Sequence, residues 1–340
     1  SQWANSHWRY EEDRFAPKTA RHTCRWLETN YKTEHFYLHV DFFDPHEPWD
    51  PPEYFVAKYA NPSYRGIPMI QPNYGLASVF SDQEIQNMKA HYKAEVEMVS
   101  KSVGAVIRKM KETGIYEDSL VIFTTDHGIY IGEHNRTGKS NLSFERDPRG
   151  TWPLYEEVTR IPLALKMPGQ QHKGKRVGAL VQPVDILPTI LELAGIDPKA
   201  NLPGKSVLPD RELRDHPGIK YGREQGLNPF HGKSLMPLIE GNEEHWHRKY
   251  AFSTHETLLP DSDAMLFWTT ITGEQFTLAL GGSPEHMPEM YYIEEDPKQQ
   301  INVYEKNRDI AAEMAKELFQ FLKSIRTDKE KIQALKTRLK

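Results

Sequence analysis

The chain has 340 residues, 38% of them hydrophobic, and a formal net charge of −5 at pH 7. A chain of this length can bury a sizeable core, and it predicts two domains or one large domain with an appendage. The negative charge argues against a general nucleic-acid binder, no apolar run is long enough to predict a membrane-spanning helix, and the single cysteine, Cys24, excludes an internal disulfide.

The first elements alternate between helix and strand. Residues 17–30 are amphipathic and predict a helix, and residues 36–42 predict a strand. The segment that follows carries Pro45 and Pro48, which force extended or turn structure. We therefore expect the side chains of this segment to lie in a loop after a strand.

A long helix and a short apolar strand come next. Ser81 and Glu84 form a capping-box pattern, and apolar residues recur behind it at helical spacing as far as Gly114. The apolar run 120–125 then predicts a buried parallel strand, which completes a strand–helix–strand unit with a right-handed crossover.

The second half of the chain predicts shorter elements. Residues 161–166 and 178–181 are strand candidates, and residues 184–194 predict a short helix closed by Gly195. Short runs separated by turns then predict antiparallel strands at 250–255, 265–272, 275–280 and 289–293. A final helix begins near residue 308, followed by a lysine-rich tail at 327–340 that we expect to be a solvated helix end.

Polar residues gather directly after the predicted strand 120–125. Asp126, His127 and Gly128 end the strand, and Lys139 follows on the same loop. In open α/β folds, ligands bind outside the carboxyl ends of strands. A carboxylate and an imidazole are possible metal ligands, and a nearby lysine suits an anionic substrate held beside a divalent metal.

These residues belong to a longer series of motifs. In chain order the motifs are Asp44-Pro-His46-Glu-Pro48-Trp49, Asp126-His127-Gly128, Gly132-Glu-His134, Gly138-Lys139, Tyr155-Glu-Glu157 with Arg160-Ile-Pro162, Val184-Asp-Ile-Leu-Pro-Thr189, Gly232-Lys-Ser-Leu-Met-Pro237 and Met290-Tyr-Tyr-Ile-Glu-Glu-Asp-Pro297. Any one of them is a weak signal, but their order is specific. The chain resembles a sulfatase of the alkaline-phosphatase superfamily over roughly residues 30–320.

The resemblance implies a fold and a domain division. We expect an α/β fold with a mostly parallel sheet sandwiched by helices, as in alkaline phosphatase, and a smaller C-terminal antiparallel sheet with a long helix. Residues 1–245 would form the C-terminal portion of the α/β sulfatase catalytic domain, and residues 246–340 a C-terminal subdomain.

The resemblance also implies roles for site residues. His46 and Lys139 would contact the sulfate, because fixed cations and donors stabilise the charge that builds when a sulfate ester is cleaved. Asp126 and His127 would hold a divalent metal, with Ca²⁺ first and Mn²⁺ or Zn²⁺ as alternatives that an imidazole also suits. His134 would line the site or orient a ligand from outside it.

The sequence departs from the family at its nucleophile. Sulfatases use a Cys or Ser in a Cys/Ser-x-Pro-x-Arg motif, oxidised to formylglycine, and these 340 residues contain no such motif. The strand ending in paired aspartates and the Gly-Lys-x-His segment are missing too. We therefore expect an incomplete catalytic domain whose nucleophile lies upstream, weak metal binding by two ligands, and little or no turnover of an aryl sulfate by this chain alone.

Two alternatives stay open at this point. A phosphodiesterase or phosphonate monoester hydrolase of the same superfamily makes similar chemical demands, and a non-catalytic remnant or binding protein would explain the missing nucleophile. The substrate expected from the resemblance is a small-molecule or carbohydrate sulfate ester, with loops 50–80 and 140–153 at the rim of its pocket. The resemblance further implies an exported protein, whether periplasmic, secreted or lysosomal, and leaves the oligomeric state open.

Overall fold

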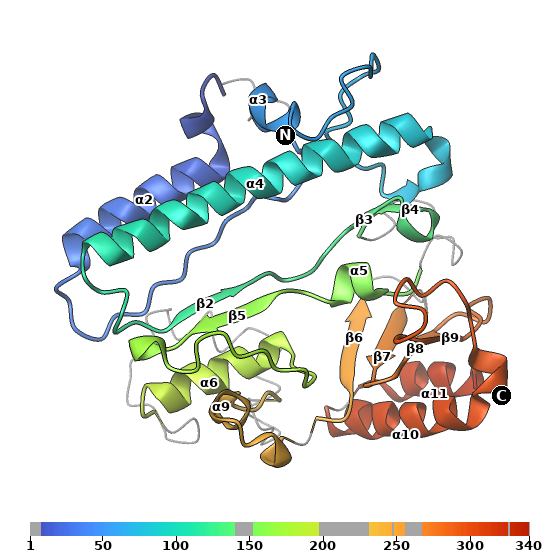
Figure 1. Ribbon diagram of the computed structural model, residues 1–340. Coiled ribbons are helices and arrows are strands. Elements are labelled where there is room, and N and C mark those ends of the chain that lie inside the picture. Colours follow the sequence, from blue (N-terminus) through green and yellow to red (C-terminus); the bar gives the residue numbers. More distant parts are fainter. Residues whose placement is uncertain are drawn as a thin grey trace, which may run out of the picture. The chain divides into compact units, whose positions relative to one another are not determined.

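The computed structural model describes residues 8–139, 152–196, 231–246, 248–255, 267–325 and 327–339 (Figure 1). The chain forms two compact units. The first unit is Ser1–Gly150 with Glu157–Lys173, and the second is Thr151–Glu156 with Gly174–Lys340. The predicted domain boundary at residue 245 stays a prediction. No helix within the described ranges is long and apolar enough to cross a membrane.

Two helices that lie side by side dominate the first unit. They are α2 (Phe15–Asn30) and α4 (Asp82–Glu112), shown in blue and cyan in Figure 1. The capping box predicted before α4 is confirmed, because the Ser81 hydroxyl accepts from the Glu84 backbone N–H and the Glu84 carboxylate accepts the Ser81 backbone N–H at 2.8 Å. Gly114 follows this helix with a φ of +79°, as a residue after a helix end often does.

Helix α4 is the surface on which the other parts of the first unit pack. The short helix α3 (Glu53–Val56) buries Phe55 and Val56 against Ala94 and Met98 of α4. A second cluster joins Trp49, Met88 of α4 and Ile131. Trp49 lies just after His46, and Ile131 lies within the 126–139 loop, so both predicted site loops are anchored on the same helix.

The strands of the first unit form two small antiparallel sheets. One pairs β2 (Val121–Thr124) with β5 (Leu163–Lys166). The other has the order β1 (Gly75–Leu76), β4 (Arg136–Gly138) and β3 (Tyr130–Ile131). These strands place the predicted site loop between the end of β2 and the end of β4.

The predicted strand at 120–125 is found, but its predicted surroundings are wrong. It pairs antiparallel with β5, and Phe123 is 47% exposed. The strand predicted at 36–42 is wrong, because these residues form no strand and no described ladder pairs them with β2. An apolar run predicts a buried strand. Whether that strand is parallel or antiparallel depends on the neighbouring strand with which its backbone forms hydrogen bonds.

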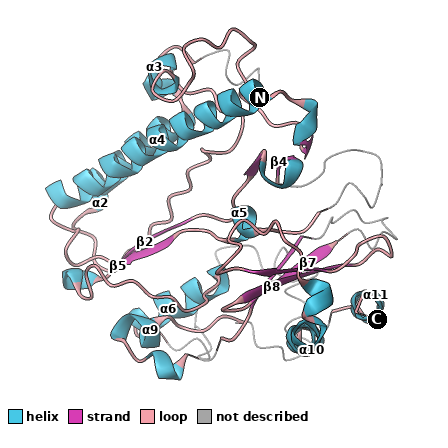
Figure 2. Ribbon diagram, turned by 45° about the vertical axis from the view of Figure 1, so that its right-hand side comes forward, coloured by secondary structure: helices cyan, strands magenta, loops and turns pink. Residues whose placement is uncertain are grey.

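The second unit contains the predicted antiparallel sheet and helix. The sheet runs in the order β6 (Ala251–His255), β7 (Trp268–Thr272), β8 (Phe276–Gly281) and β9 (Glu289–Tyr292), and Figure 2 shows β7 and β8 side by side. Helices α10 (Arg308–Ser324) and α11 (Lys329–Thr337) pack with this sheet in one hydrophobic core. The core includes Ile271, Leu278, Leu280, Met290, Met314, Leu318 and Leu335. Because Leu335 is buried, the lysine-rich tail is a packed helix rather than a solvated end.

The remaining elements are short. They are α5 (Glu156–Thr159), α6 (Ile186–Leu193) and α9 (Met236–Glu240), and α6 confirms the helix predicted at 184–194. The strand predicted at 178–181 is wrong. The Leu180 carbonyl accepts from the Trp246 indole N–H at 3.0 Å, so a side chain satisfies a backbone group that a ladder would otherwise use.

Candidate active site

The turn after β2 brings two predicted site residues together. The His127 Nδ1 lies 2.9 Å from the Gly128 carbonyl oxygen. A carbonyl oxygen can only accept, so Nδ1 carries the hydrogen, and whenever the ring is neutral its lone pair is on Nε2. That Nε2 lies 3.5 Å from Asp126 Oδ2. The two atoms best able to hold a cation therefore lie next to each other.

Asp126 is a charged group at the surface of the turn. Its side chain is 83% exposed, and its Oδ1 accepts the His127 backbone N–H at 2.8 Å. Partial desolvation raises the pKa of this carboxyl, but the neighbouring His127 ring and the backbone hydrogen bonds outweigh it and hold the pKa below its ordinary value. Asp126 is therefore ionised at neutral pH and available as an anionic oxygen ligand.

Gly128 fits this turn because another backbone segment lies against it. Its N–H donates to the Val158 carbonyl at 2.9 Å. A Cβ at this position would lie 1.9 Å from the Glu157 carbonyl oxygen, closer than any real contact. The glycine is therefore required for close approach, and the segment after Glu156 sets the position of the turn.

The Gly132–His134 motif forms the tip of a hairpin between β3 and β4. The Gly132 N–H donates to the Arg136 carbonyl at 2.8 Å, and His134 and Asn135 adopt left-handed φ angles of 51° and 55°. Glu133 accepts the Ile131 N–H and pairs with Lys89 of α4 at 2.7 Å. The hairpin is thus fixed to α4 although its tip is strained.

Lys139 directly follows this hairpin. In the preceding strand, Thr137 is fully buried and pairs with Gly75 of β1, and Gly138 pairs with Tyr130 of β3. Gly138 has a φ of +96°, and a Cβ there would lie 2.9 Å from the Tyr74 ring. Lys139 is partly buried and is the last described residue before 140–151, so the predicted rim loop at 140–153 lies mostly outside the described residues.

His46 lies in a loop with a buried base. Its Nδ1 donates to the Glu47 carbonyl oxygen at 2.8 Å, and its ring stacks on Phe43 with centroids 4.6 Å apart. Below it, the Trp49 indole N–H donates to the Pro45 carbonyl oxygen at 2.8 Å. The ring of His46 is partly exposed, and the loop that carries it is held by its own hydrogen bonds.

Two buried carboxyl groups lie near the His46 loop. Asp44 accepts the Ala16 N–H at 2.7 Å, and burial raises its pKa. Glu95 of α4 is 3% exposed. Its burial, and to a smaller extent the charge of Asp44, raises its pKa to about 9, although the charge of Arg14 lowers it. Glu95 is therefore neutral at pH 7.

The structure assembles some of the predicted residues and not others. Asp126 and His127 are together, and His134 lies near Glu157, a residue of the Tyr155-Glu-Glu157 motif. No residue of the 126–139 loop hydrogen bonds or ion-pairs with His46, and within the described ranges no group of three or more His, Cys, Asp or Glu side chains could hold a metal ion. Glu157 could not be identified from sequence spacing, because it meets the loop only through the fold.

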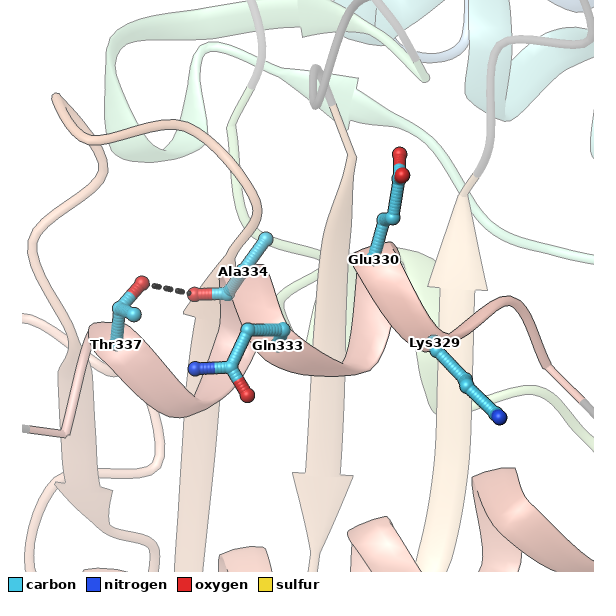
Figure 3. Close-up of a pocket in the computed structure, with 5 residues that line it drawn as sticks. All are labelled: Lys329, Glu330, Gln333, Ala334 and Thr337. Atoms are coloured by element: carbon cyan, nitrogen blue, oxygen red, sulfur yellow. Dashed lines mark hydrogen bonds between the residues drawn. The ribbon is translucent and has the colours of Figure 1, made fainter.

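A hollow elsewhere carries no comparable chemistry. It has a volume of about 520 Å³ and is lined by residues of α11 alone, namely Lys329, Glu330, Gln333, Ala334 and Thr337 (Figure 3). Lys329 and Glu330 point away from each other in this view, and the Thr337 hydroxyl donates to the Ala334 carbonyl of its own helix at 2.7 Å. Polar groups do not converge there as they do in ligand sites.

Comparison with known proteins gives consistent similarities. The chain is 26% identical to arylsulfatase K of Xenopus laevis over 215 residues, which cover 62% of this chain and 37% of that protein. Among solved structures, it is similar to the phosphonate monoester hydrolase of Agrobacterium radiobacter, with a TM-score of 0.66, 20% identity and coverage of 93% of this chain and 61% of the other.

A third similarity is to a protein solved with its substrate D-glucosamine-2-N,6-O-disulfate. Its TM-score is 0.64 at 16% identity, with coverage of 93% of this chain and 71% of the other. The two structural similarities confirm the predicted α/β class. The chain spans little more than a third of the length of its arylsulfatase relative. The sulfatase family model matches residues 2–196, more than half of the sequence, and the chain therefore belongs to the sulfatase family.

Proposed function

We propose that this chain contributes the metal-binding and sulfate-binding residues of a sulfuric ester hydrolase. The observation that carries the proposal is the arrangement of Asp126 and His127. An ionised carboxylate oxygen and an imidazole lone pair lie 3.5 Å apart at the end of a strand, with the ring held in one tautomer by the Gly128 carbonyl. Two ligands of a single ion, bonded at about 2.0–2.6 Å, lie about 3–4 Å apart, so the donor set fits a divalent metal.

A divalent metal held by these two residues would supply a fixed positive charge beside the negatively charged sulfuryl oxygens. Asp126 and His127 are two donors, whereas Ca²⁺ takes six to eight oxygen ligands. We therefore propose that binding by these two residues alone is weak, and that further ligands complete the site in the whole protein. Ca²⁺ is the first candidate, and the imidazole leaves Mn²⁺ and Zn²⁺ open.

His46 and Lys139 are the proposed sulfate-binding residues. The Nδ1 of His46 is engaged with Glu47, so its Nε2 is the atom free to face a substrate, and it donates a hydrogen bond when the ring is doubly protonated. Lys139 adds an ammonium group with three donors at the end of β4. Together they would neutralise the sulfate and stabilise the leaving oxygen as its bond to sulfur breaks.

The nucleophile is the part of the reaction that these residues do not provide. The 340 residues lack the Cys/Ser-x-Pro-x-Arg motif that yields formylglycine in the family. The activity proposed is therefore that of the whole protein, in which the nucleophile comes from outside this sequence. The substrate proposed is a sulfated carbohydrate, supported by the sulfated glucosamine substrate of the similar solved structure, and an exported protein would meet such a substrate.

A phosphonate monoester hydrolase is the second candidate. The chain shares the fold of one such enzyme, and an Asp–His pair followed by a lysine on the same loop also suits a phosphonate or phosphodiester. Relative rates decide between the two. The full product of the native gene is assayed with 4-nitrophenyl sulfate, bis(4-nitrophenyl) phosphate and a phenylphosphonate monoester, with and without Ca²⁺ or Mn²⁺.

We expect the highest kcat/KM on the sulfate and a loss of at least about 100-fold in Lys139→Met and His46→Gln, the size of effect seen when a charge-stabilising group is removed. Lys18→Met, at an exposed position of α2, is the matched control and keeps the parent rate. Preference for the phosphonate favours the second candidate. Absence of turnover of all three esters by the full product favours a non-catalytic role.

A further inference from the structure

One short segment contacts both ends of the loop that carries the proposed site residues. The backbone of Glu157 and Val158 holds the turn at Gly128, through the Val158 carbonyl and the close approach of the Glu157 carbonyl. The side chain of Glu157 reaches the hairpin tip, where its Oε2 lies 3.3 Å from His134 Nε2.

The burial of this pair shows that it is more than a surface contact. The His134 side chain is 11% exposed and that of Glu157 is 25% exposed. The Oε2 atom of Glu157 is buried and has no hydrogen-bond partner among the described residues. Leaving a buried carboxylate oxygen without a donor is costly. His134 Nε2 lies within ion-pair distance of this oxygen, and a hydrogen on that nitrogen would make it the donor.

A structural role as a helix cap does not account for this geometry. Helix α5 has only four residues, and no hydrogen bond joins the Glu157 carboxylate to a backbone N–H of that helix. His134, in contrast, adopts a left-handed φ of 51°, which is costly for a residue with a side chain. Its ring lies edge-on to Tyr130 with centroids 6.1 Å apart, and Glu157 is its charged neighbour.

We propose that Glu157 is a positioning residue for the candidate active site. Its carboxylate pairs with His134 and holds the left-handed hairpin tip, and its backbone positions the Gly128 turn. Because Asp126 and His127 precede that turn and Lys139 follows that hairpin, the one residue fixes the metal-binding and sulfate-binding ends of the loop relative to each other. This role rests on the proposed function for its consequence in catalysis, whereas the contacts themselves can be tested without turnover.

Histidine NMR tests the contacts directly. The full 340-residue chain, labelled with ¹⁵N-histidine and free of metal, is recorded as parent, Glu157→Ala and Glu157→Gln, and signals are assigned with single His variants. We expect a protonated Nε2 on His134 and a protonated Nδ1 on His127 in the parent. Glu157→Ala shifts or broadens both sets of signals, and Glu157→Gln restores them because its amide oxygen accepts from the same N–H.

The control is Glu112→Ala, which removes an exposed carboxylate at the end of α4 and leaves both histidines unchanged. Because Glu157→Ala removes a buried group, His134→Asn serves as a second variant that removes the contact between Glu157 and His134. Asparagine tolerates the left-handed conformation at this position. We therefore expect the His127 signals to change in the same way in both variants. Unchanged His127 signals in both variants, or a Gln variant as perturbed as the Ala variant, overturn the proposal.

Mn²⁺ provides a readout tied to function. This paramagnetic ion broadens signals of nearby nuclei, and in the parent the His127 signals broaden first. We expect Glu157→Ala to raise the Mn²⁺ concentration for half-broadening by at least about tenfold, as loss of supporting contacts does at other metal sites. If the metal-free spectra behave as expected but Mn²⁺ never broadens His127, the positioning role stands and the proposed metal site fails. If Mn²⁺ broadens His127 equally in all variants, the positioning role fails.

Discussion

The two loops of the candidate site are held in opposite ways. In the His46 loop, the flanking residues Asp44, Glu47 and Trp49 are all buried. In the 126–139 loop, the Asp126 side chain is 83% exposed, and the tip carries left-handed residues. Both loops reach the same cluster on α4, through Trp49 and Ile131.

The difference separates two ways of placing a functional side chain. The His46 loop is positioned by burying its own neighbours, so its geometry depends on core packing. The 126–139 loop keeps its proposed metal-binding end exposed and depends on a distant segment, at Glu157 and Val158, for its shape. We therefore expect changes in the first loop to act mainly on folding and changes in the second to act mainly on binding.

The largest expected effect comes from removing the buried anchor of the first loop. Trp49 is fully buried between Met88 and Ile131, so Trp49→Ala should lower the free energy of unfolding by about 3–5 kcal/mol. Urea unfolding followed by circular dichroism measures it. Tyr37→Ala, at a side chain that is 71% exposed, is the control and should stay within about 0.5 kcal/mol. Equal changes in the free energy of unfolding for the two variants would contradict the claim that core packing positions the His46 loop.

The second effect depends on pH. Glu95 has a pKa of about 9 in the folded protein against 4.5 as its ordinary value, so the folded state holds a proton that the unfolded state releases. The parent therefore loses stability as the pH rises between these values, and Glu95→Gln does not. The free energy of unfolding of the variant, relative to that of the parent, should rise by up to about 3 kcal/mol at pH 7 and should change little below pH 4.5. A gain independent of pH would contradict the neutral state of Glu95.

The third effect tests the contact with the distant segment. A Cβ on Gly128 would collide with the Glu157 carbonyl oxygen, so Gly128→Ala should cost about 1–3 kcal/mol and displace the Asp126 turn. Gly178→Ala is the matched control, because a Cβ there meets no atom within 4 Å. Unfolding curves and the His127 NMR signals of both variants check this. If Gly128→Ala matches its control in both the unfolding curve and the His127 NMR signals, close packing of Glu157 against Gly128 does not hold the turn in place.

The smallest effect on stability is expected at the exposed end of the second loop. Asp126→Asn changes an exposed side chain and should alter the free energy of unfolding by no more than about 0.5 kcal/mol. Its Mn²⁺ affinity, measured by calorimetry, should fall at least about tenfold, whereas the exposed control Asp118→Asn keeps the parent affinity. A strongly destabilised Asp126→Asn would show that this residue serves folding instead.

The features that the sequence predicted well are local ones. The capping box at Ser81 needs only residues three apart, and Asp126 and His127 are adjacent in the chain, so their proximity follows from the sequence itself. The direction of β2 and the role of Glu157 depend on residues far along the chain. No period or spacing encodes those pairings, because they arise when packing brings β5 and α5 to the loop.

The central claim is that Asp126 and His127 bind one divalent metal. Crystals grown with Mn²⁺, with diffraction recorded at the manganese absorption edge, test it most directly. The account predicts an anomalous peak bonded to Asp126 Oδ2 and His127 Nε2. Anomalous density at other residues, with none between these two atoms, would contradict it.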